Sequence, residues 1–292
     1  MNSDLMKRIT ERRAGFSKGQ RRIADFITLN LDKAAFMTAY ALGKTVGVSE
    51  STVVRFATEL GYDGYPHMQR ALREYANTRL TSVQRIDVTS ERLKNRSILK
   101  TVMESDVEKI RKTLEVVDEE TFNRAVERIL GARHIYILGM RISSFLADFL
   151  GFYLKLIFNN VTIVGGAPNE GDIFEQLFRA GEGDLVIGIS FPRYSKRTLR
   201  GLRFALDRKA DVISITDSQA SPIAGISDCT LFAPSEMASF VDSLVAPLSL
   251  INALIISVGI RKKEELIRTF EDLERIWEEY ETYETSDSSI QD

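Results

Sequence analysis

The chain has 292 residues, with 39 Lys and Arg against 41 Asp and Glu, and 44% of its residues are hydrophobic. This length is enough for two domains with separate cores, and the composition is ordinary for a globular protein. A net charge of −2 argues against a protein that binds nucleic acid over its whole surface. Residues 1–80, however, hold 13 Lys and Arg against 8 Asp and Glu, which confines attraction to phosphate to the N-terminal part.

The N-terminus lacks the apolar segment of an export signal, and the single Cys229 cannot form a disulfide within the chain. We therefore expect a cytoplasmic protein. A first helix is predicted after Ser17, whose hydroxyl can cap it. Its apolar side is formed by Phe16, Ile23, Phe26 and Ile27. Basic residues fall largely on the other side, so this pattern indicates a supporting helix with a basic edge.

The sequence LGKTVGVSESTVVRFATEL, which starts at Leu42, has the pattern of a helix-turn-helix. A first helix is expected over 37–46 and a second over 50–60, with a Gly-Val turn between them. Ser49 precedes the second helix and can cap it by accepting a hydrogen bond from a backbone amide in the first turn. Gly61 is suited to end that helix, because a left-handed residue often follows a helix C-terminus.

In the second helix Val53, Ala57 and Leu60 repeat at the spacing of a buried face, so the opposite face is polar. That face carries Arg55 beside short hydroxyl side chains, and an Arg on a helix in the major groove can bond O6 and N7 of guanine. The residues that we expect to contact DNA are Lys18, Lys44, Ser49, Ser51, Thr52 and Arg55. The alternative is an ordinary helical hairpin with a solvated face.

Pro66 is expected to open a further helix that runs through Tyr75. The segment 78–97 then loses clear periodicity and becomes mostly polar, which predicts an interdomain linker. Helical spacing resumes at Ile98 and continues through two amphipathic helices, the second of which ends at Gly131.

After residue 131, short β-branched runs alternate with helical patterns. Strands are expected over 134–138, 161–164, 184–190, 211–216 and 229–233, and helices over 143–158, 170–178, 196–209 and 240–258. Such alternation implies a mostly parallel sheet with helices on both faces. We therefore expect an all-α helix-turn-helix domain over 1–77, a linker over 78–97, an α/β three-layer sandwich over 98–280, and an acidic disordered tail over 281–292.

The longest apolar run, residues 244–260, is near the minimum length of a membrane span but contains Pro247 and several polar residues. We interpret it as a helix that is buried in protein or lies at a subunit interface, and we expect no membrane partner. A final helix places Leu266, Phe270, Leu273 and Trp277 on one face.

Two loops that follow predicted strands are rich in hydroxyl groups, one from Gly139 to Ser144 and one from Ser190 to Thr198. In an open α/β sheet, ligands bind beyond the carboxyl ends of the strands. Helix-start amides, hydroxyls and nearby Arg or Lys can hold a phosphate or phosphosugar there. Neither loop has a Walker motif or the three-glycine dinucleotide pattern, which disfavours ATP and NAD. The alternative is that Ser143 and Ser195 only cap their helices.

Sugar isomerisation would require a base with a supporting partner. His134 starts a predicted strand, and Glu170 and Glu236 lie near the proposed loops without a titratable partner. We therefore expect no enzymatic activity, no cofactor and no metal site. The alternative is a phosphosugar isomerase with an accessory DNA-binding module, in which Glu170 or Glu236 acts as the base.

Three stretches, VGVSESTVVRFATELGYDGY, ISFPRYSKRTL and SFVDSLVAPLSLINALI, resemble the RpiR/MurR family of bacterial transcriptional regulators, and the resemblance covers nearly the whole chain. It implies an N-terminal helix-turn-helix and a C-terminal sugar isomerase (SIS) domain that binds a phosphorylated sugar. Carried over to this chain, the phosphosugar site is Ser143, Ser144, Ser190, Ser195 and Thr198. Two departures stand out: Arg141 replaces a second glycine of many SIS domains, and residues 191–194 replace the Ser-Gly turn of sugar isomerases.

We expect a regulator of carbohydrate metabolism genes that binds a double-stranded DNA operator as a homodimer or homotetramer, with a phosphosugar controlling the binding. A symmetric dimer would read two half-sites about 34 Å apart, or a multiple of that distance. A third possibility is a regulator whose effector site is vestigial and which responds only to a protein partner.

Overall fold

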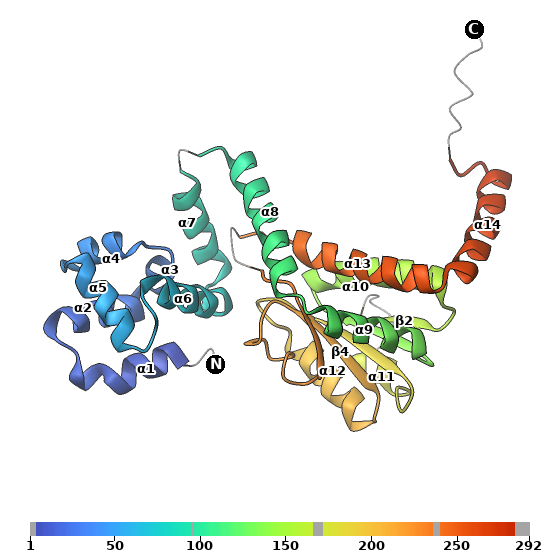
Figure 1. Cartoon of the computed structure of the whole chain (residues 1–292), viewed down its shortest axis with the longest axis horizontal. Helices are drawn as coiled ribbons and strands as arrows, with labels where there is room; N and C mark the ends of the chain where they lie inside the picture. The colour runs from blue at the N-terminus through green and yellow to red at the C-terminus, as the bar shows by residue number, and fades with distance from the viewer. Residues whose placement is uncertain (1–3, 95, 166–171, 236–239, 284–292) are drawn as a thin grey trace, which may run out of the picture.

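The computed structural model describes residues 4–94, 96–165, 172–235 and 240–283. Figure 1 shows a helical N-terminal lobe, two connecting helices, and a C-terminal lobe built around a sheet. The N-terminal helices are α1 Asp4–Arg12, α2 Lys18–Leu29, α3 Leu31–Ala34, α4 Ala39–Val46, α5 Glu50–Glu59 and α6 Tyr65–Arg79. The helix-turn-helix is thus present as α4 and α5. The sequence did not predict α1, although Leu5 and Ile9 lie four residues apart and are buried in the same core as Phe56.

The connecting helices are α7 Ser82–Leu93 and α8 Ile98–Val116. The segment 78–97, expected to be a linker, is therefore largely helical, and Thr81 and Gln84 form a capping box at the start of α7. Its polar pattern concealed the helix because one of its buried side chains is charged: Arg85 is only 6% exposed. Val88 of α7 packs against the N-terminal core. The boundaries between domains stay a prediction.

The C-terminal lobe has five parallel strands in the order β2-β1-β3-β4-β5. They are β1 Ile135–Gly139, β2 Val161–Val164, β3 Leu185–Ile189, β4 Asp211–Thr216 and β5 Cys229–Phe232. The helices of this lobe are α9 Glu119–Gly131, α10 Ile142–Ile157, α11 Ile173–Leu177, α12 Lys196–Asp207, α13 Val245–Arg261 and α14 Lys263–Glu279. The expected three-layer fold is confirmed, since alternate residues of β1 enter two separate cores, one with α9, α10 and α13 and one with α11 and α12.

Helix α13 begins at Val245, later than the expected 240, because Pro247 is tolerated only in the first turn of a helix. Its Ile251 and Leu254 are fully buried in the lobe. No single helix in the described part of the chain is long and apolar enough to cross a membrane. Taken together, α13 and α14 would be long and apolar enough, but the two helices meet at an angle of 97°. The apolar face of α14 is half-buried, and residues 284–292 of the expected tail lie outside the described residues.

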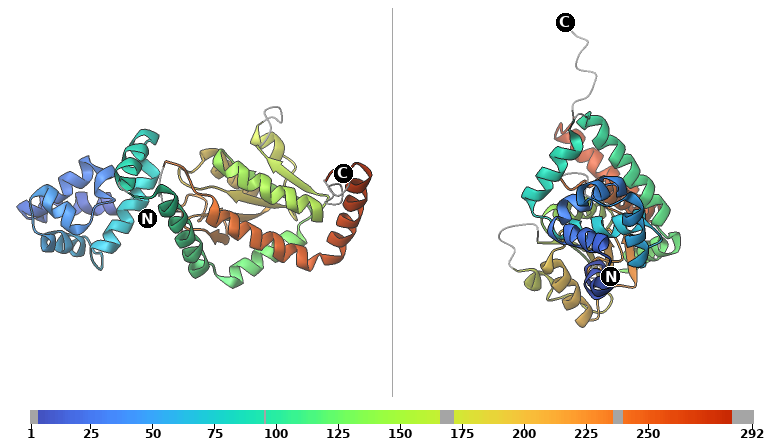
Figure 2. Two further views of the ribbon diagram at one scale, coloured as in Figure 1. Left: turned by 90° about the horizontal axis from the view of Figure 1, so that it is seen from above. Right: turned by 90° about the vertical axis from the view of Figure 1, so that its left-hand side faces the viewer.

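The carboxyl ends of the strands lie at the edge of the sheet that faces the N-terminal lobe, as Figures 1 and 2 show. The helices α10, α12 and α13 begin at this same edge. The loops that the sequence analysis proposed for ligand binding therefore lie at the end of the sheet that faces the N-terminal lobe.

Candidate functional site

The turn between α4 and α5 is tight. Gly47 ends α4 with a φ of +67°, a conformation that favours glycine. Gly43 lets the turn fold back onto α4, since a Cβ there would lie 2.9 Å from the carbonyl oxygen of Val48. Arg22 of α2 donates hydrogen bonds to the carbonyl oxygens of Val46 and Gly47, the latter at 2.9 Å. Arg22 therefore holds the turn against α2, and its guanidinium group is already engaged in these hydrogen bonds.

The first turn of α5 is built around the Ser49 hydroxyl. Its Oγ accepts a hydrogen bond from the amide of Thr52 at 3.3 Å and lies 2.9 Å from Ser51 Oγ and 2.8 Å from Thr52 Oγ1. The predicted cap is therefore present, with Thr52 as its donor. These three hydroxyls form one compact polar cluster at the N-terminus of the helix.

The two faces of α5 divide as the sequence predicts. Val53 and Ala57 are fully buried, together with Phe56, which the sequence analysis had not assigned to this face. Arg55 is exposed, and its Nε donates to the Ser51 carbonyl oxygen at 3.3 Å. The guanidinium group therefore lies along the outer face of the helix and close to the hydroxyl cluster, where an edge of a base pair could meet both.

Lys18 and Lys44 are exposed on the helices that flank α5. The residue after Lys18 is Gly19, whose Cβ position lies 3.3 Å from Val48 Cγ1 and 3.5 Å from Thr52 Cγ2. The start of α2 is therefore packed against the start of α5. This placement puts the positive charge of Lys18 beside the polar face, at a position suited to contact a phosphate.

At the carboxyl end of β1, the chain turns sharply into α10. A Cβ on Gly139 would lie 2.4 Å from the Ser143 carbonyl oxygen, so only glycine fits there. Arg141 has φ +58° and ψ −127°, a region that side chains rarely adopt, at the position where the family pattern has glycine. Ser143 is buried, and Ser144 Oγ donates to the Arg141 carbonyl oxygen at 2.7 Å, so the latter hydroxyl also holds the turn.

The loop between β3 and α12 brings the other three predicted residues together. Ser195 caps α12 by accepting from the Thr198 amide at 3.2 Å, and Ser190 Oγ accepts from the Ser195 amide at 3.3 Å. Ser190 and Thr198 are buried. The hydroxyl of Thr198 is fully buried and has no hydrogen-bond partner within the described ranges. An unsatisfied buried hydroxyl is costly, which makes it a candidate to bind a ligand.

The two loops are neighbours because β1 and β3 are paired, with Gly139 opposite Ile189 at the ends of the strands. This is also the point where the strand order reverses, the usual ligand site in an open α/β sheet. We call the set Ser143, Ser144, Ser190, Ser195 and Thr198 the cradle. It combines two helix N-termini with several hydroxyl groups, which are features that can hold a phosphate, and Arg141, Arg193 and Lys196 are exposed beside it.

One polar pair beside the cradle was not found by the sequence analysis. Tyr194 Oη donates to Asp217 Oδ1 at 2.9 Å, and Asp217 directly follows β4. Burial raises the pKa of Asp217 to about 6. Burial, and then the Asp217 charge, raise the pKa of Tyr194, and the carboxylate of Glu74 in α6 contributes in the same direction. The loop of the cradle is thus electrostatically in reach of the N-terminal lobe.

The raised pKa of Asp217 predicts a pH dependence of stability. The protonated Asp217 carboxyl group contributes to the free energy of unfolding. This contribution is fully present below the ordinary pKa of 3.8 and is lost as pH rises through about 6, since the folded state then contains a poorly solvated charge. The expected loss is about 3 kcal/mol in all, roughly half of it between pH 5 and pH 7.5. Asp217→Asn keeps an acceptor for Tyr194 and removes the charge, so its urea stability should fall less over this pH range. Equal losses for the two proteins would refute this assignment.

Of the residues considered as catalytic bases, His134 lies away from the cradle. His134 Nε2 lies 2.9 Å from Thr162 Oγ1, and both side chains are at the amino ends of their strands, on the opposite edge of the sheet. Glu170 and Glu236 lie outside the described residues. A carboxylate that does lie beside the cradle is Asp217, which already accepts the hydroxyl of Tyr194.

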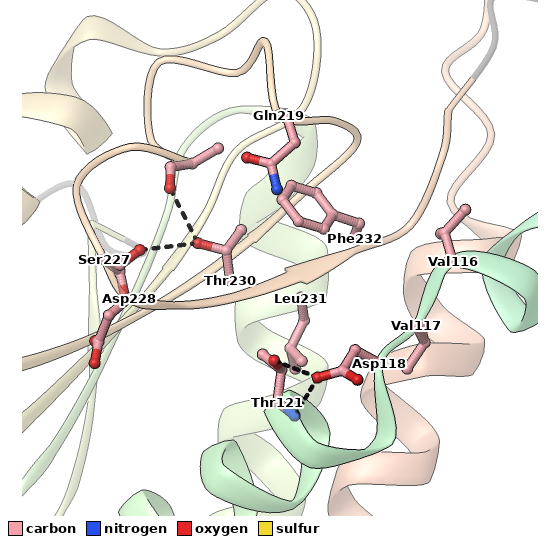
Figure 3. Close-up of a pocket in the computed structure, with 11 residues that line it drawn as sticks. Val116, Val117, Asp118, Thr121, Gln219, Ser227, Asp228, Thr230, Leu231 and Phe232 are labelled. Atoms are coloured by element: carbon pink, nitrogen blue, oxygen red, sulfur yellow. Dashed lines mark hydrogen bonds between the residues drawn. The ribbon is translucent and has the colours of Figure 1, made fainter.

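A cavity of about 380 Å³ lies elsewhere, along the edge strand β5. Its lining comes from the connection between α8 and α9 on one side and from β5 and the segment before it on the other (Figure 3). Asp118 there caps α9, and hydrogen bonds from Thr121 lower the pKa of this carboxyl group. The lining contains two carboxylates and no Lys or Arg, so this cavity is unsuited to a phosphate.

Comparison with known proteins matches residues 3–79 to the helix-turn-helix domain of the rpiR family and residues 128–257 to the SIS domain. An HTH-type transcriptional regulator of Caldanaerobacter subterraneus subsp. tengcongensis is 24% identical, over 94% of this chain and 97% of that protein. The sugar isomerase domain of an RpiR transcription factor from Sphaerobacter thermophilus is 28% identical with a TM-score of 0.57, covering 61% of this chain and 98% of that one. The NanR protein of Vibrio vulnificus, solved with ManNAc-6P, is 25% identical with a TM-score of 0.54, covering 93% and 98%.

Proposed function

This chain belongs to the RpiR family of helix-turn-helix transcriptional regulators that carry a SIS domain, and on that premise we propose that a phosphosugar bound in the cradle controls its affinity for an operator. The observation that carries this proposal is the buried Thr198 hydroxyl, which lacks a partner within the described ranges and lies on the capped first turn of α12. A phosphate oxygen would complete its hydrogen bonding once a shift of the loop lets the ligand reach this enclosed hydroxyl. The NanR relative, described with ManNAc-6P, supports a sugar phosphate as the ligand class.

At the DNA end, we propose that α5 lies in the major groove. Arg55 would read guanine, and the hydroxyl cluster of Ser49, Ser51 and Thr52 would allow close approach to the base edges. Lys18 and Lys44 would contact phosphates and so set affinity and salt dependence rather than sequence preference.

At the sheet end, we propose that the phosphate lies against the N-termini of α10 and α12. Hydroxyls of the cradle would be the donors, apart from that of Ser144, which already donates to the Arg141 carbonyl oxygen. Arg141 or Arg193 would add a charge-assisted bond. A thermal-shift screen over sugar phosphates, amino-sugar phosphates and sugar acids tests this function. A ligand present at about 100 times its Kd should stabilise the protein by about 2.7 kcal/mol. Stabilisation by none of these compounds would contradict the proposal.

We propose that the ligand is bound without turnover. Among the described residues, the carboxylate of Asp217 beside the cradle is occupied by Tyr194, and a base for isomerisation would have to reach a carbon-bound proton. The Caldanaerobacter relative is named as a transcriptional regulator and the Sphaerobacter relative as a transcription factor, which supports this interpretation. Incubation of each stabilising compound with the protein, followed by product analysis, should show no aldose–ketose conversion.

We propose that the protein acts as a homodimer or a higher oligomer through α8. One helix-turn-helix contacts only a half-site, so a symmetric operator requires a second copy of this chain. A stripe at helical spacing runs along α8, and its side chains are 39% to 81% exposed: Leu99, Met103, Val107, Ile110 and Leu114. A second α8 of the same kind would bury this stripe, as in the self-complementary interface of a two-fold dimer.

The double substitution Met103→Asp and Leu114→Asp should therefore convert the oligomer into a monomer and weaken operator binding at least about tenfold, because two charges would enter the apolar interface. Analytical ultracentrifugation gives the mass, and circular dichroism checks the fold. Glu115→Gln, a change of one charge on an exposed residue outside the stripe, is the matched control. An unchanged mass for the double variant would rule out this interface.

A further inference from the structure

Helix α7 is tied to the C-terminal lobe by an ion pair in which the arginine is buried and the aspartate is partly exposed. Arg85 Nη1 lies 2.8 Å from Asp242 Oδ1, and the Arg85 side chain is only 7% exposed. The two residues are 157 positions apart in the sequence. Asp242 belongs to the short segment that leads from the sheet edge into α13, whereas α7 packs through Val88 on the core of the N-terminal lobe. One ion pair thus joins the two lobes.

The next residue of the same segment binds the neighbouring helix. Ser243 Oγ donates to Asp106 Oδ1 of α8 at 2.7 Å, and Lys109 Nζ, with its side chain 6% exposed, lies 2.9 Å from the same oxygen. Figures 1 and 2 both show the start of α13 beside α8. Asp242 therefore binds α7, and the next residue, Ser243, binds α8. These two helices connect the N-terminal lobe to the sheet. We call Arg85, Asp106, Lys109, Asp242 and Ser243 the latch.

The latch is close in the fold to the cradle. Phe191, which follows Ser190 of the cradle, is 6% exposed and belongs to the same apolar cluster as Leu244 and Leu250 at the start of α13. On the other side of the same loop, the charge of Glu74 in α6 contributes to the raised pKa of Tyr194. The loop of the cradle and the start of α13 therefore belong to one apolar cluster, through which a ligand that moves the loop can act on α13.

We propose that the latch is the element that transmits occupancy of the cradle to the helix-turn-helix, a role that rests on the function proposed above. Closed, it fixes α7 and α8 against the start of α13 and so sets the position of α5. Because a buried Arg left without its carboxylate is costly, Arg85 either keeps Asp242 or moves out to water, so the ion pair favours two distinct positions of α7 over a graded series. Such an element is what coupling between two sites requires.

The first test uses the full chain without any ligand. Spin labels on Thr58→Cys in α5 and Arg203→Cys in α12, with Cys229→Ala and an excess of unlabelled chain, report the distance between the lobes within one molecule. Wild-type latch residues should give one narrow distance distribution. Asp242→Asn and Arg85→Met should each broaden it, and Arg85→Met guards against misfolding because it leaves no unpaired buried cation. Asp228→Asn, which breaks the exposed Arg128 pair, is the matched control and should stay narrow.

The second test measures coupling, with N-acetylmannosamine 6-phosphate and inorganic phosphate as probes. In the wild type a bound probe should change operator affinity about 5- to 150-fold, and in the latch variants by less than about twofold. Narrow distances or retained coupling in both latch variants would overturn the proposal. Failure of any sugar phosphate to stabilise the wild type would instead overturn the proposed function, and the distance measurement would still report on the latch.

Discussion

The Thr198→Val variant should be more stable than the wild type in the absence of effector and should lose the stabilisation that a phosphosugar gives. The reason is the fully buried Thr198 hydroxyl, which has no hydrogen-bond partner within the described part of the chain. Removing such a group while keeping the shape of the side chain should stabilise the free protein by about 1 to 3 kcal/mol. The same change would remove a donor to the bound phosphate.

A gain in stability without ligand, together with a loss of stabilisation by ligand, distinguishes a ligand-binding hydroxyl from one that only caps a helix. Urea denaturation gives the stability of the free protein, and thermal shift with the phosphosugar gives the effect of the ligand. Ser143→Ala with Ser195→Ala should also abolish the ligand effect, but at the cost of a helix cap. Ser97→Ala, which removes the comparable cap of α8, is the control for that loss and should leave the ligand effect intact. Undiminished stabilisation of Thr198→Val would place the phosphate elsewhere.

Arg55→Ala should reduce the preference for the operator over random DNA by about 1 to 3 kcal/mol. The guanidinium lies on the exposed face of α5, beside the hydroxyl cluster at the helix start, and is free of ion pairs that any described residue provides. Its loss should therefore leave folding unchanged. Fluorescence anisotropy with operator and scrambled duplexes at one salt concentration gives the ratio.

Lys44→Ala is the matched control for this experiment, because Lys44 is exposed on the adjacent α4. It should weaken binding to both duplexes alike and reduce the salt dependence by about one unit of slope. An operator preference that survives Arg55→Ala, or one that Lys44→Ala removes, would contradict these roles.

The elements that sequence reasoning found are those whose signals are local. The strands of the sheet are short β-branched runs, and each was predicted to within about two residues, as such runs are when both faces of a sheet are buried. Ser17 and Ser49 were expected as caps and Ser195 as a cap or a ligand residue, and each accepts an amide hydrogen bond at its helix start. The possibility that Ser143 caps α10 is wrong, because the helix begins at Ile142 and Arg141 stands at the cap position. Gly61 indeed has a positive φ, at +87°.

The features that were missed depend on contacts between distant segments. Arg85 gives α7 a polar pattern, and only its partner Asp242, far along the chain, explains why a charge is buried there. Tyr194 and Asp217 meet because β3 and β4 are neighbours, which the order of the sequence does not reveal. The Thr198 hydroxyl could be assigned to the cradle from its motif, but its burial without a partner required the packed structure.

The most direct test of the central claim is the affinity of the full-length protein for its operator, measured with and without a saturating phosphosugar that stabilises the protein in the thermal screen. We expect the sugar to change operator affinity, and the operator to change sugar affinity by the same factor, because coupling between two sites is reciprocal. Identical operator affinity in the presence and absence of a demonstrably bound phosphosugar would contradict the claim that the cradle controls the helix-turn-helix.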